Sequence, residues 1–406
     1  LPAYTAGPPS WCCKGVPALD TAAFDSLSAT QLMAAGSRKW TAFPGCIGAF
    51  VAEMDFGLAP PIRQALDKAM ADGLTGYLTP KLLHDLGEAC AQWQLAQHGW
   101  AIRPDDVNVM PDVLSALEAV LRHFLPAGTP VIVPVPCYMP FIPILNWVGN
   151  PVIQLPMLRT QDGWQMDEAG LDAAFAGGAG LLLLCNPHNP IGKVYTREEL
   201  ARISAIVDRH GARVFSDEIH APLVFEGQQH VPYAAVNEVA ATHAISAISA
   251  SKMWNLAGLK CAQLVLTNDQ DRARWRRIGH RVNDATATFG VIAHTAAWAQ
   301  GEPWRQQVLP YLQGNRDLLT RHLAAHLPQI GYLPAQGTYL AWLDCRALAL
   351  SPTPQAFFRQ HARVAMTDGA DCGDGGQGHV RLNFGLPRPL LMQALAQMTQ
   401  AVAAFS

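Results

Sequence analysis

The sequence predicts an α/β protein, with a large domain built on a mainly parallel β-sheet flanked by helices and a smaller α+β domain after it. Three observations predict this class. The middle of the chain alternates apolar, strand-like runs with helical segments, as successive βαβ units do. One run, residues 181–185, is continuously apolar, which is typical of a strand covered on both faces. After Gly301 the order changes to a long helix, two strands and a closing helix.

The first elements follow from apolar periodicity. Residues 60–72 are predicted to form a helix because their apolar side chains recur at helical spacing. Residues 131–135 are a predicted strand inside a stretch, residues 123–158, that contains no Asp, Glu, Lys or Arg. Prolines interrupt this stretch repeatedly, so it predicts buried strands and turns and not a membrane-spanning helix.

The next elements form the repeating βαβ pattern. Thr196 and Glu199 have the spacing of a capping box, so a helix is predicted from here to about His210, with Gly211 ending it. Strands are predicted at residues 181–185, 213–219, 244–250 and 262–267. Strands joined by helical crossovers are expected to lie parallel in one sheet.

The last part of the chain predicts a separate, smaller unit. A helix is expected over residues 304–327, strands over 339–343 and 380–384, and a closing helix from about residue 389. We therefore expect three parts. Residues 1–59 are an N-terminal arm partly packed on the small domain, residues 60–300 the large domain, and residues 301–406 the small C-terminal domain.

Composition excludes several classes of protein. Of 406 residues, 50% are hydrophobic and 15% charged, so the chain is predicted to be folded and not disordered. The net charge of −3 argues against a nucleic-acid or anionic-membrane partner, and the main basic block, residues 272–281, is expected to be a solvated helix face. The nine cysteines have neither disulfide nor zinc-ligand spacing, so we expect no metal site and free thiols in a reducing cytoplasm.

A lysine flanked by hydroxyl groups stands at the end of the predicted strand 244–250. Ser249, Ser251 and Lys252 form this group. An amine is a useful nucleophile toward a carbonyl when burial or nearby cations lower its pKa, and the hydroxyls are suited to hold a phosphate. Taken alone, a lysine after a serine is more often a surface residue.

Two neighbouring strand ends also carry polar side chains. A carboxylate at Asp217 is placed to pair with a protonated pyridine nitrogen, and His220 to reach the adjacent ring oxygen. Asn189 lies in a turn with two Asn-Pro steps after the strand 181–185, at the sheet edge where ligands bind in open α/β folds. Each feature alone is also explained as an ordinary strand exit or a rigid loop.

Together these segments resemble the fold type I pyridoxal-phosphate enzymes, the class I/II aminotransferase superfamily. Within it, the pattern is most similar to the MalY/PatB-type cystathionine β-lyases, or C–S lyases. The matching segments are LLLLCNPHNPIGKVY, VFSDEIHAPLVFEG, SASKMWNLAGLK, GTYLAWLDCR and VRLNFGLPR, preceded by FVAEMDF, LTGY and PVPCYMPF. The resemblance spans about residues 24–400. It implies an aspartate-aminotransferase-like fold in which residues 60–300 bind pyridoxal phosphate.

The resemblance implies a role for each matched residue. Lys252 carries the cofactor as a Schiff base and moves the substrate's Cα proton, while Asp217 pairs with the pyridine nitrogen. Asn189 and His220 contact the ring oxygen, and Tyr138 stacks on the ring. The phosphate contacts implied are Ser249, Ser251, Lys260 and the N–H groups of Val113 and Leu114.

Two further residues are assigned in the same way. Arg381 is implied to clamp the substrate α-carboxylate through its two parallel N–H donors. Tyr77 is implied to be catalytic and to reach the phosphate in the site of a partner subunit. A homodimer with shared active sites is therefore expected, and the low charge fraction fits a buried dimer interface.

Two segments depart from the family's pattern. The phosphate-binding turn usually carries a glycine, but residues 110–114 read Met-Pro-Asp-Val-Leu, which puts the negative charge of Asp112 beside the expected phosphate. The loop before the Arg381 strand usually contains Phe-Gly, whereas residues 371–374 read Asp-Cys-Gly-Asp. The pocket wall near the substrate is expected to differ here.

The activity implied is that of a pyridoxal-phosphate-dependent C–S β-lyase, which cleaves cystathionine or a related S-substituted cysteine to a thiol, pyruvate and ammonia. A pyridoxal-phosphate-dependent aminotransferase is the first alternative, because the two enzyme classes share these site residues. A regulatory or scaffold protein on the same fold is the second. The expected small-molecule partner is an amino-acid substrate.

Overall fold

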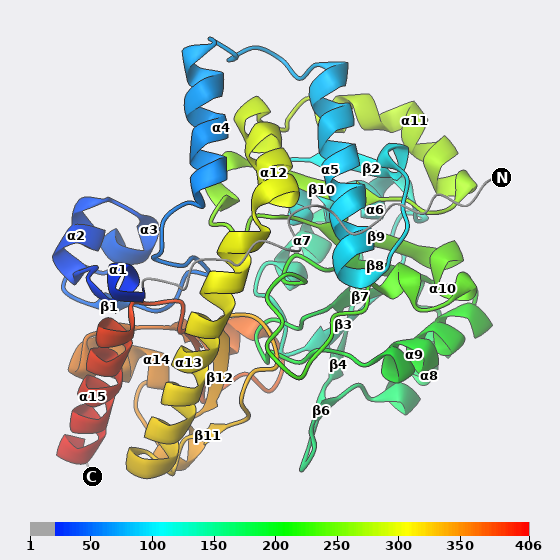
Figure 1. The fold of residues 1–406 in the computed structure, drawn as a ribbon. Helices are drawn as coiled ribbons and strands as arrows, with labels where there is room; N and C mark the ends of the chain where they lie inside the picture. Colours follow the sequence, from blue (N-terminus) through cyan, green and yellow to red (C-terminus); the bar gives the residue numbers. More distant parts are fainter. Residues whose placement is uncertain (1–20, 406) are drawn as a thin grey trace.

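The computed structural model describes residues 21–405, apart from the side chains at positions 21, 280 and 281. The expectations for residues 1–20 lie outside this described part. Figure 1 shows a large β-sheet surrounded by helices on the right, and a smaller sheet at the lower left beside the C-terminus. The predicted α/β class, with a mostly parallel large sheet, is confirmed.

The large sheet has seven strands and positions the candidate site. The strand order is β2 (Val107–Met110), β10 (Ala262–Val265), β9 (Ala244–Ile248), β8 (Arg213–Asp217), β7 (Leu181–Cys185), β3 (Val131–Val135) and β4 (Val152–Pro156). The strands from β9 to β4 are mutually parallel, and β10 is antiparallel to both of its neighbours. The carboxyl ends of β7, β8 and β9 therefore meet at one edge.

Helices cover both faces of this sheet. Successive side chains of a strand point to opposite faces, so neighbouring residues of one strand belong to different cores. Val133 and Leu183 belong to one apolar core, with residues of α6, α7 and α11. Ile132 and Leu182 belong to the other core, with residues of α5, α9 and α12. Burial on both sides explains why residues 181–185 are continuously apolar.

Helix ends follow local signals in the sequence. The helix α4 starts with prolines in its first turn, where a missing N–H has no consequence. Both hydrogen bonds of the predicted capping box join Thr196 and Glu199 at the start of α9. The helices of the large unit are α4 (Pro60–Ala71), α5 (Pro80–His98), α6 (Val113–His123), α7 (Phe141–Val148), α8 (Glu168–Ala176), α9 (Arg197–Arg209), α10 (Glu238–His243), α11 (Asp269–Asn283) and α12 (Thr288–Gln300).

The predicted strands 213–219, 244–250 and 262–267 each end two residues early in the structure. At the first two ends, the residues after the last strand position turn into the candidate site instead of continuing the ladder. A two-stranded hairpin, β5 (Leu158–Thr160) and β6 (Gly163–Gln165), projects from the large unit. Arg159 on this hairpin lies 3.5 Å from Asp344 of the small sheet.

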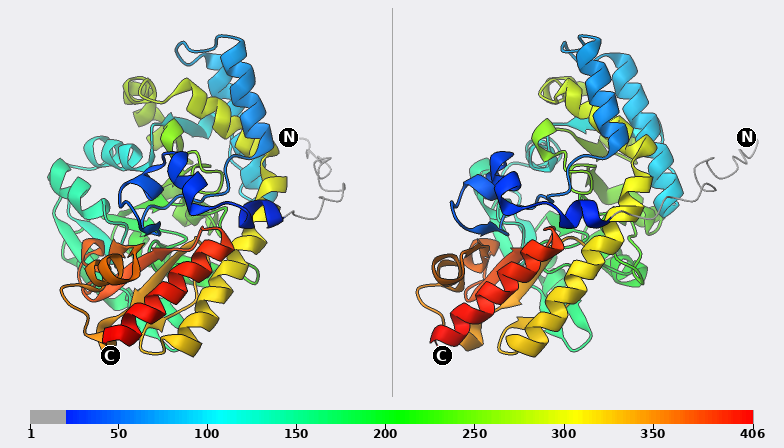
Figure 2. Two further views of the ribbon diagram at one scale, coloured as in Figure 1. Left: turned by 90° about the vertical axis from the view of Figure 1, so that its left-hand side faces the viewer. Right: turned by 60° about the vertical axis from the view of Figure 1, so that its left-hand side comes forward.

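The small sheet is antiparallel, with the order β11 (Gly331–Tyr332), β12 (Leu340–Asp344), β15 (His379–Asn383) and β14 (Thr367–Asp368). Two long helices, α13 (Glu302–His326) and α15 (Arg388–Phe405), lie side by side against it, as both views of Figure 2 show. The short α14 (Pro354–Phe357) packs nearby. We propose that the two domains divide at Gly301, which ends α12 and precedes α13.

Residues 21–59 contact the small sheet, where the backbone N–H of Asn383 on β15 donates to the carbonyl of Ala49. They contain α1 (Thr21–Asp25), α2 (Ala29–Ala34), α3 (Arg38–Thr41) and β1 (Ile47–Gly48), and β1 pairs with β13 (Val364–Ala365). The buried ammonium group of Lys39 pairs with Asp55 within this segment, at 2.8 Å, and joins the segment to the carbonyl of Gly385, at 3.1 Å.

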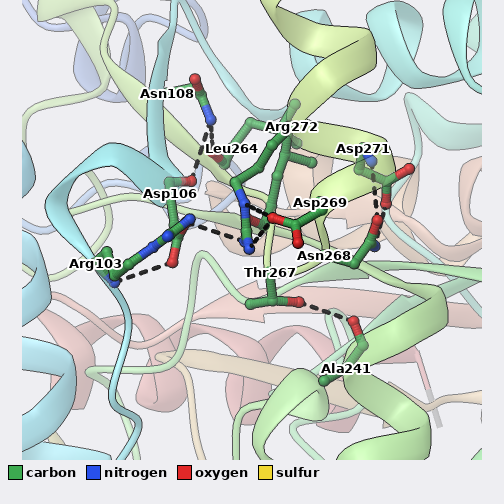
Figure 3. Close-up of polar contacts among 11 residues, drawn as sticks. Arg103, Asp106, Asn108, Ala241, Leu264, Thr267, Asn268, Asp269, Asp271 and Arg272 are labelled. Atoms are coloured by element: carbon green, nitrogen blue, oxygen red, sulfur yellow. Dashed lines mark hydrogen bonds and ion pairs between the residues drawn. The ribbon is translucent and has the colours of Figure 1, made fainter. Parts of the chain in front are cut away.

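The basic block of residues 272–281 is only partly a solvated face. Figure 3 shows that Arg103 and Arg272 converge on the carboxylate of Asp106, and that Arg272 also contacts Asp269. The side chain of Arg272 is 15% exposed. The expectation of a solvated face is therefore wrong for this residue, because its charge ties α11 to the edge of the sheet.

Three further observations concern cysteines, metal ligands and membrane-spanning helices among the described residues. In the part of the chain that the structure describes, the seven cysteines are free and buried. Among the same residues, no group of His, Cys, Asp and Glu side chains has an arrangement suited to a metal ion. None of the described helices is both long enough and apolar enough to cross a membrane.

Candidate active site

A cavity of about 190 Å³ lies at the carboxyl ends of β7, β8 and β9, next to the first turn of α6. It brings together ten residues singled out in the sequence. They are Val113, Leu114, Tyr138, Asn189, Asp217, His220, Ser249, Ser251, Lys252 and Lys260. Tyr77 and Arg381 are the two singled-out residues that do not line it.

The strand ends explain how distant residues meet here. Asn189 follows β7 in a loop whose two Asn-Pro peptide bonds are both cis. Asp217 is the last residue of β8, and Ser249 directly follows β9. Because these three strands are adjacent and parallel, their ends present side chains to one space.

Lys252 is half-buried, and its amine contacts the protein backbone. Its Nζ donates a hydrogen bond to the carbonyl of Ala52 at 3.2 Å. Burial and the nearby Arg381 lower the pKa of Lys252 to about 8, against the opposing charges of Glu53 and Asp217. The amine therefore loses its proton more readily than an ordinary lysine, as a nucleophile or a base requires.

Asp217 is a buried carboxyl group near that lysine. Its Oδ1 accepts a hydrogen bond from the backbone N–H of Ile219 at 3.1 Å. Burial raises the pKa of Asp217 to about 7, although this hydrogen bond and the Lys252 charge act in the opposite direction. A cationic ring nitrogen is the partner that would favour its ionised form.

Where the cavity meets the first turn of α6, the protein presents hydrogen-bond donors for an anion. The first N–H groups of a helix have no partner within it, and Val113 and Leu114 supply them at the start of α6. The ammonium group of Lys260 lies 2.9 Å from Asp112. Asp112 also accepts a hydrogen bond from the backbone N–H of Ser115 at 2.8 Å.

The carboxylate of Asp112 thus interacts with neighbouring residues of this chain, Ser115 and Lys260. Burial alone would raise the pKa of Asp112, but the bonds from Ser115 and Lys260 lower it overall. Ser249 is likewise occupied, since its Oγ lies 3.0 Å from the carbonyl of Cys261 and 3.1 Å from Nε2 of His294. Ser251 has no such side-chain partner among the described residues, so it is the freer of the two hydroxyls.

Arg381 lies beside the cavity and contacts its wall. One guanidinium nitrogen, Nη1, donates to Oδ1 of Asn189 at 3.1 Å. The other, Nη2, donates to the carbonyl of Phe50 at 2.8 Å and lies 3.2 Å from the hydroxyl of Thr367. The side chain is buried, and its Nε has no partner within the described chain. An anion bound next to Asn189 would meet this fixed cation.

Tyr77 is the exception among the predicted site residues. It stands between α4 and α5, and 93% of it is exposed. The single chain does not bring Tyr77 to its own cavity.

The sequence predicted no role for the backbone of residues 50–53, yet this segment contacts both Lys252 and Arg381. The carbonyl of Ala52 accepts from Lys252 and, at 2.8 Å, from the hydroxyl of Tyr339, while the carbonyl of Phe50 accepts from Arg381. The motif FVAEMDF marked the segment, but main-chain acceptors leave no residue signature.

The loop of residues 371–374 lies next to the segment that carries Tyr138, but none of its residues lines the cavity, so a different pocket wall stays a prediction. The backbone N–H of Cys137 donates to the carbonyl of Cys372 at 2.8 Å. The N–H of Asp374 donates to the side chain of Gln154 at the same distance. These contacts place the loop against the strand that leads to Tyr138.

The donors and acceptors of the cavity fit pyridoxal phosphate. Asp217 suits the ring nitrogen, and the buried Nδ1 of His220, which lacks a partner among the described residues, suits the ring oxygen together with Asn189. The N-terminus of α6, with Ser251 and Lys260, suits the phosphate. The amine of Lys252 suits the aldehyde.

Comparisons with known proteins agree with this arrangement. A family model described as aminotransferase class I and II matches residues 48–398. The cystathionine beta-lyase of Corynebacterium glutamicum is 35% identical, over 90% of this chain and 96% of its own. Cystathionine beta-lyase PatB of Bacillus subtilis is 30% identical, over 87% and 92%.

The same similarity holds between structures. A protein from Corynebacterium diphtheriae, described as a "putative plp-dependent beta-cystathionase", superposes with a TM-score of 0.88 at 37% identity. The match covers 93% of this chain and 98% of the other. By its sequence over nearly the whole length and by its fold, this chain belongs to the class I and II aminotransferase family.

Proposed function

We propose that this protein is a pyridoxal-phosphate-dependent C–S β-lyase acting on cystathionine or a related S-substituted cysteine. One observation carries the proposal: Lys252, Asp217 and Asn189 share a single buried cavity whose donors fit the cofactor. The names of the relatives at 30% and 35% identity support the choice of reaction within the family.

The overall reaction balances with one water. The Cα–H and Cβ–S bonds of the substrate break, and the sulfur leaves as a thiol. The remaining three carbons take up water and give pyruvate and ammonia. Pyridoxal phosphate, when bound, supplies an aldehyde for the substrate amine and a ring that accepts the electron pair from Cα.

The residues of this chain orient the substrate and move its proton. Arg381 is positioned to bind the α-carboxylate, since its guanidinium is already fixed by Asn189 and the Phe50 carbonyl. Lys252 is assigned to take the proton from Cα at Nζ, where its lowered pKa leaves part of the amine unprotonated near neutral pH. Asp217, which is buried in the cavity, would pair with the ring nitrogen of the cofactor and favour its protonated form.

Incubation with cystathionine alone tests the proposal. We expect pyruvate and free thiol without any added keto acid. Strict dependence on a keto acid would instead establish an aminotransferase, which the family allows. The protein should turn yellow with pyridoxal phosphate and the Lys252→Ala variant should not. A wild-type protein that stays colourless with added cofactor would refute the enzymatic function and leave a regulatory or scaffold role.

We further propose a homodimer in which Tyr77 completes the partner's site. Tyr77 is 93% exposed, and Met70 and Leu74, at the end of α4 and just after it, are 63% and 36% exposed. A second copy would bury this apolar group and place Tyr77 near a phosphate. We also propose a cytoplasmic location, because the described cysteines are free thiols. A fully active monomer in solution would contradict the shared site.

A further inference from the structure

A second cavity, of about 310 Å³, adjoins the first. Ser251 and Ala257 line both. Its other walls come from the N-terminal segment and from the turn after Lys252. They include the apolar side chains Leu32, Met54 and Leu58. A chain of methylene groups leaving the Lys252 cavity on this side would meet an apolar surface.

The backbone at this boundary is held on both sides. The side-chain amide of Asn383 donates to the carbonyls of Val51 and Glu53. Asn255 accepts from the N–H of Met54 at 2.9 Å and donates to its carbonyl at 3.1 Å. The backbone of Glu53 is therefore fixed at the wall of the second cavity.

The carboxylate of Glu53 is the unpaired charge in this lining. It has neither a hydrogen bond nor an ion pair with any residue the structure describes, and its residue is half-buried. One cation of this segment, Lys39, already bonds Asp55 at 2.8 Å and the main-chain oxygen of Glu53 at 3.0 Å. Asp55 also accepts from the indole of Trp40 at 2.8 Å. Only Glu53 remains for a cation that enters the cavity.

The negative charge of Glu53 also affects Lys252, the residue proposed to act on the substrate. It opposes the effects of burial and Arg381, which lower the pKa of Lys252. Glu53 also directly follows Ala52, whose carbonyl accepts a hydrogen bond from the amine of Lys252 at 3.2 Å. Glu53 is therefore within the range of a group attached to the same substrate molecule.

We propose that the second cavity receives the S-substituent of the substrate and that Glu53 binds a protonated amine on that substituent. The inference rests on the proposed lyase function and narrows its substrate class. The preferred substrates are cysteine thioethers whose distal arm ends in an ammonium group, of which cystathionine is one. Arg381 would fix the near carboxylate and Glu53 the distal amine, so the Cα–H and Cβ–S bonds are held between two charged contacts.

A matched pair of substrates tests this assignment with the cofactor-loaded enzyme. S-(2-aminoethyl)cysteine and S-propylcysteine have nearly the same size and differ in the distal charge. For wild type, kcat/KM should be higher for the aminoethyl compound. In Glu53→Gln, the ratio of the two kcat/KM values should fall by about 10- to 100-fold, the range of a charged hydrogen bond. The loss should appear mainly in KM.

Asp162→Asn is the matched control variant. It makes the same charge change in the turn between β5 and β6, outside both cavities, and should keep the wild-type ratio. A ratio in Glu53→Gln equal to that of wild type would overturn the inference, because the charge would then have no part in recognition. An equal loss on both substrates would overturn it in favour of a structural role. If wild-type enzyme releases pyruvate from neither compound nor from cystathionine, the proposed function itself fails.

Discussion

Asp217→Asn should stabilise the cofactor-free protein at pH 8, although it should impair catalysis. Burial raises the pKa of Asp217 from 3.8 to about 7. Each pKa unit corresponds to 1.36 kcal/mol, so the ionised side chain costs the folded chain about 4 kcal/mol. Asparagine keeps the acceptor for the N–H of Ile219 but loses the attraction to Lys252. We therefore expect a net gain of about 2–4 kcal/mol in the free energy of unfolding.

The pH dependence of the free energy of unfolding shows whether the buried charge of Asp217 causes this difference in stability. Between about pH 4 and pH 7 the folded wild type keeps a proton on Asp217 that the unfolded chain has lost, so its stability falls as the pH rises. The advantage of Asp217→Asn should shrink to less than half at pH 5, where the folded carboxyl group is protonated. Urea unfolding at pH 5 and pH 8, at one protein concentration after removal of the cofactor, measures both values.

A control variant distinguishes the effect of removing a buried, unpaired carboxylate from the effect of removing a carboxylate that forms ion pairs. Asp106→Asn removes a carboxylate that pairs with Arg103 and Arg272, so it should destabilise the protein at pH 8. Bound pyridoxal phosphate should stabilise wild type more than Asp217→Asn, because only the acid supplies a charge for the ring nitrogen. A cofactor-free Asp217→Asn that is less stable than wild type at pH 8 would refute the reasoning.

Three other experiments test the remaining parts of the site. Arg381→Lys should lower kcat/KM for cystathionine about 100-fold or more, since a lysine cannot reproduce the fixed guanidinium fork; a loss below tenfold would contradict the carboxylate role. Tyr77→Ala and Lys252→Ala should each be nearly inactive, but mixing and refolding them together should restore activity if one hybrid site receives both intact residues; no recovery would argue against a shared site. Asn255→Ala should lower the free energy of unfolding by about 2–4 kcal/mol, because three backbone contacts to residues 54 and 57 are lost, and an unchanged urea midpoint would show these contacts to be dispensable.

The central part of the site could be predicted from the sequence because local signals and sheet order act together. Asn189, Asp217 and Lys252 each follow an apolar run, and neighbouring parallel strands bring such ends to one edge. The boundaries were less accurate. Strands predicted to reach residues 219 and 250 end at 217 and 248, since the chain turns toward the cavity before the apolar pattern ends.

Other features had no signal in a single sequence. The antiparallel insertion of β10 between β2 and β9 depends on long-range pairing. The carbonyl groups of Phe50 and Ala52 act through the backbone, which every residue type shares. The burial of Arg272 depends on Asp106, which is far away in the sequence. In the proposed homodimer, the position of Tyr77 relative to the cofactor depends on a second chain.

The backbone of residues 50–52 links the amine of Lys252 to the guanidinium of Arg381 through two carbonyl oxygens. Because the acceptors are main-chain atoms, side-chain substitutions at positions 50 and 52 leave them in place, whereas deleting one residue would shift one acceptor out of register. Evolution in this segment should therefore tolerate changes of residue type more readily than changes of length. In the proposed mechanism, the length of this loop therefore sets the distance between the guanidinium that binds the substrate's carboxylate and the amine that takes its Cα proton.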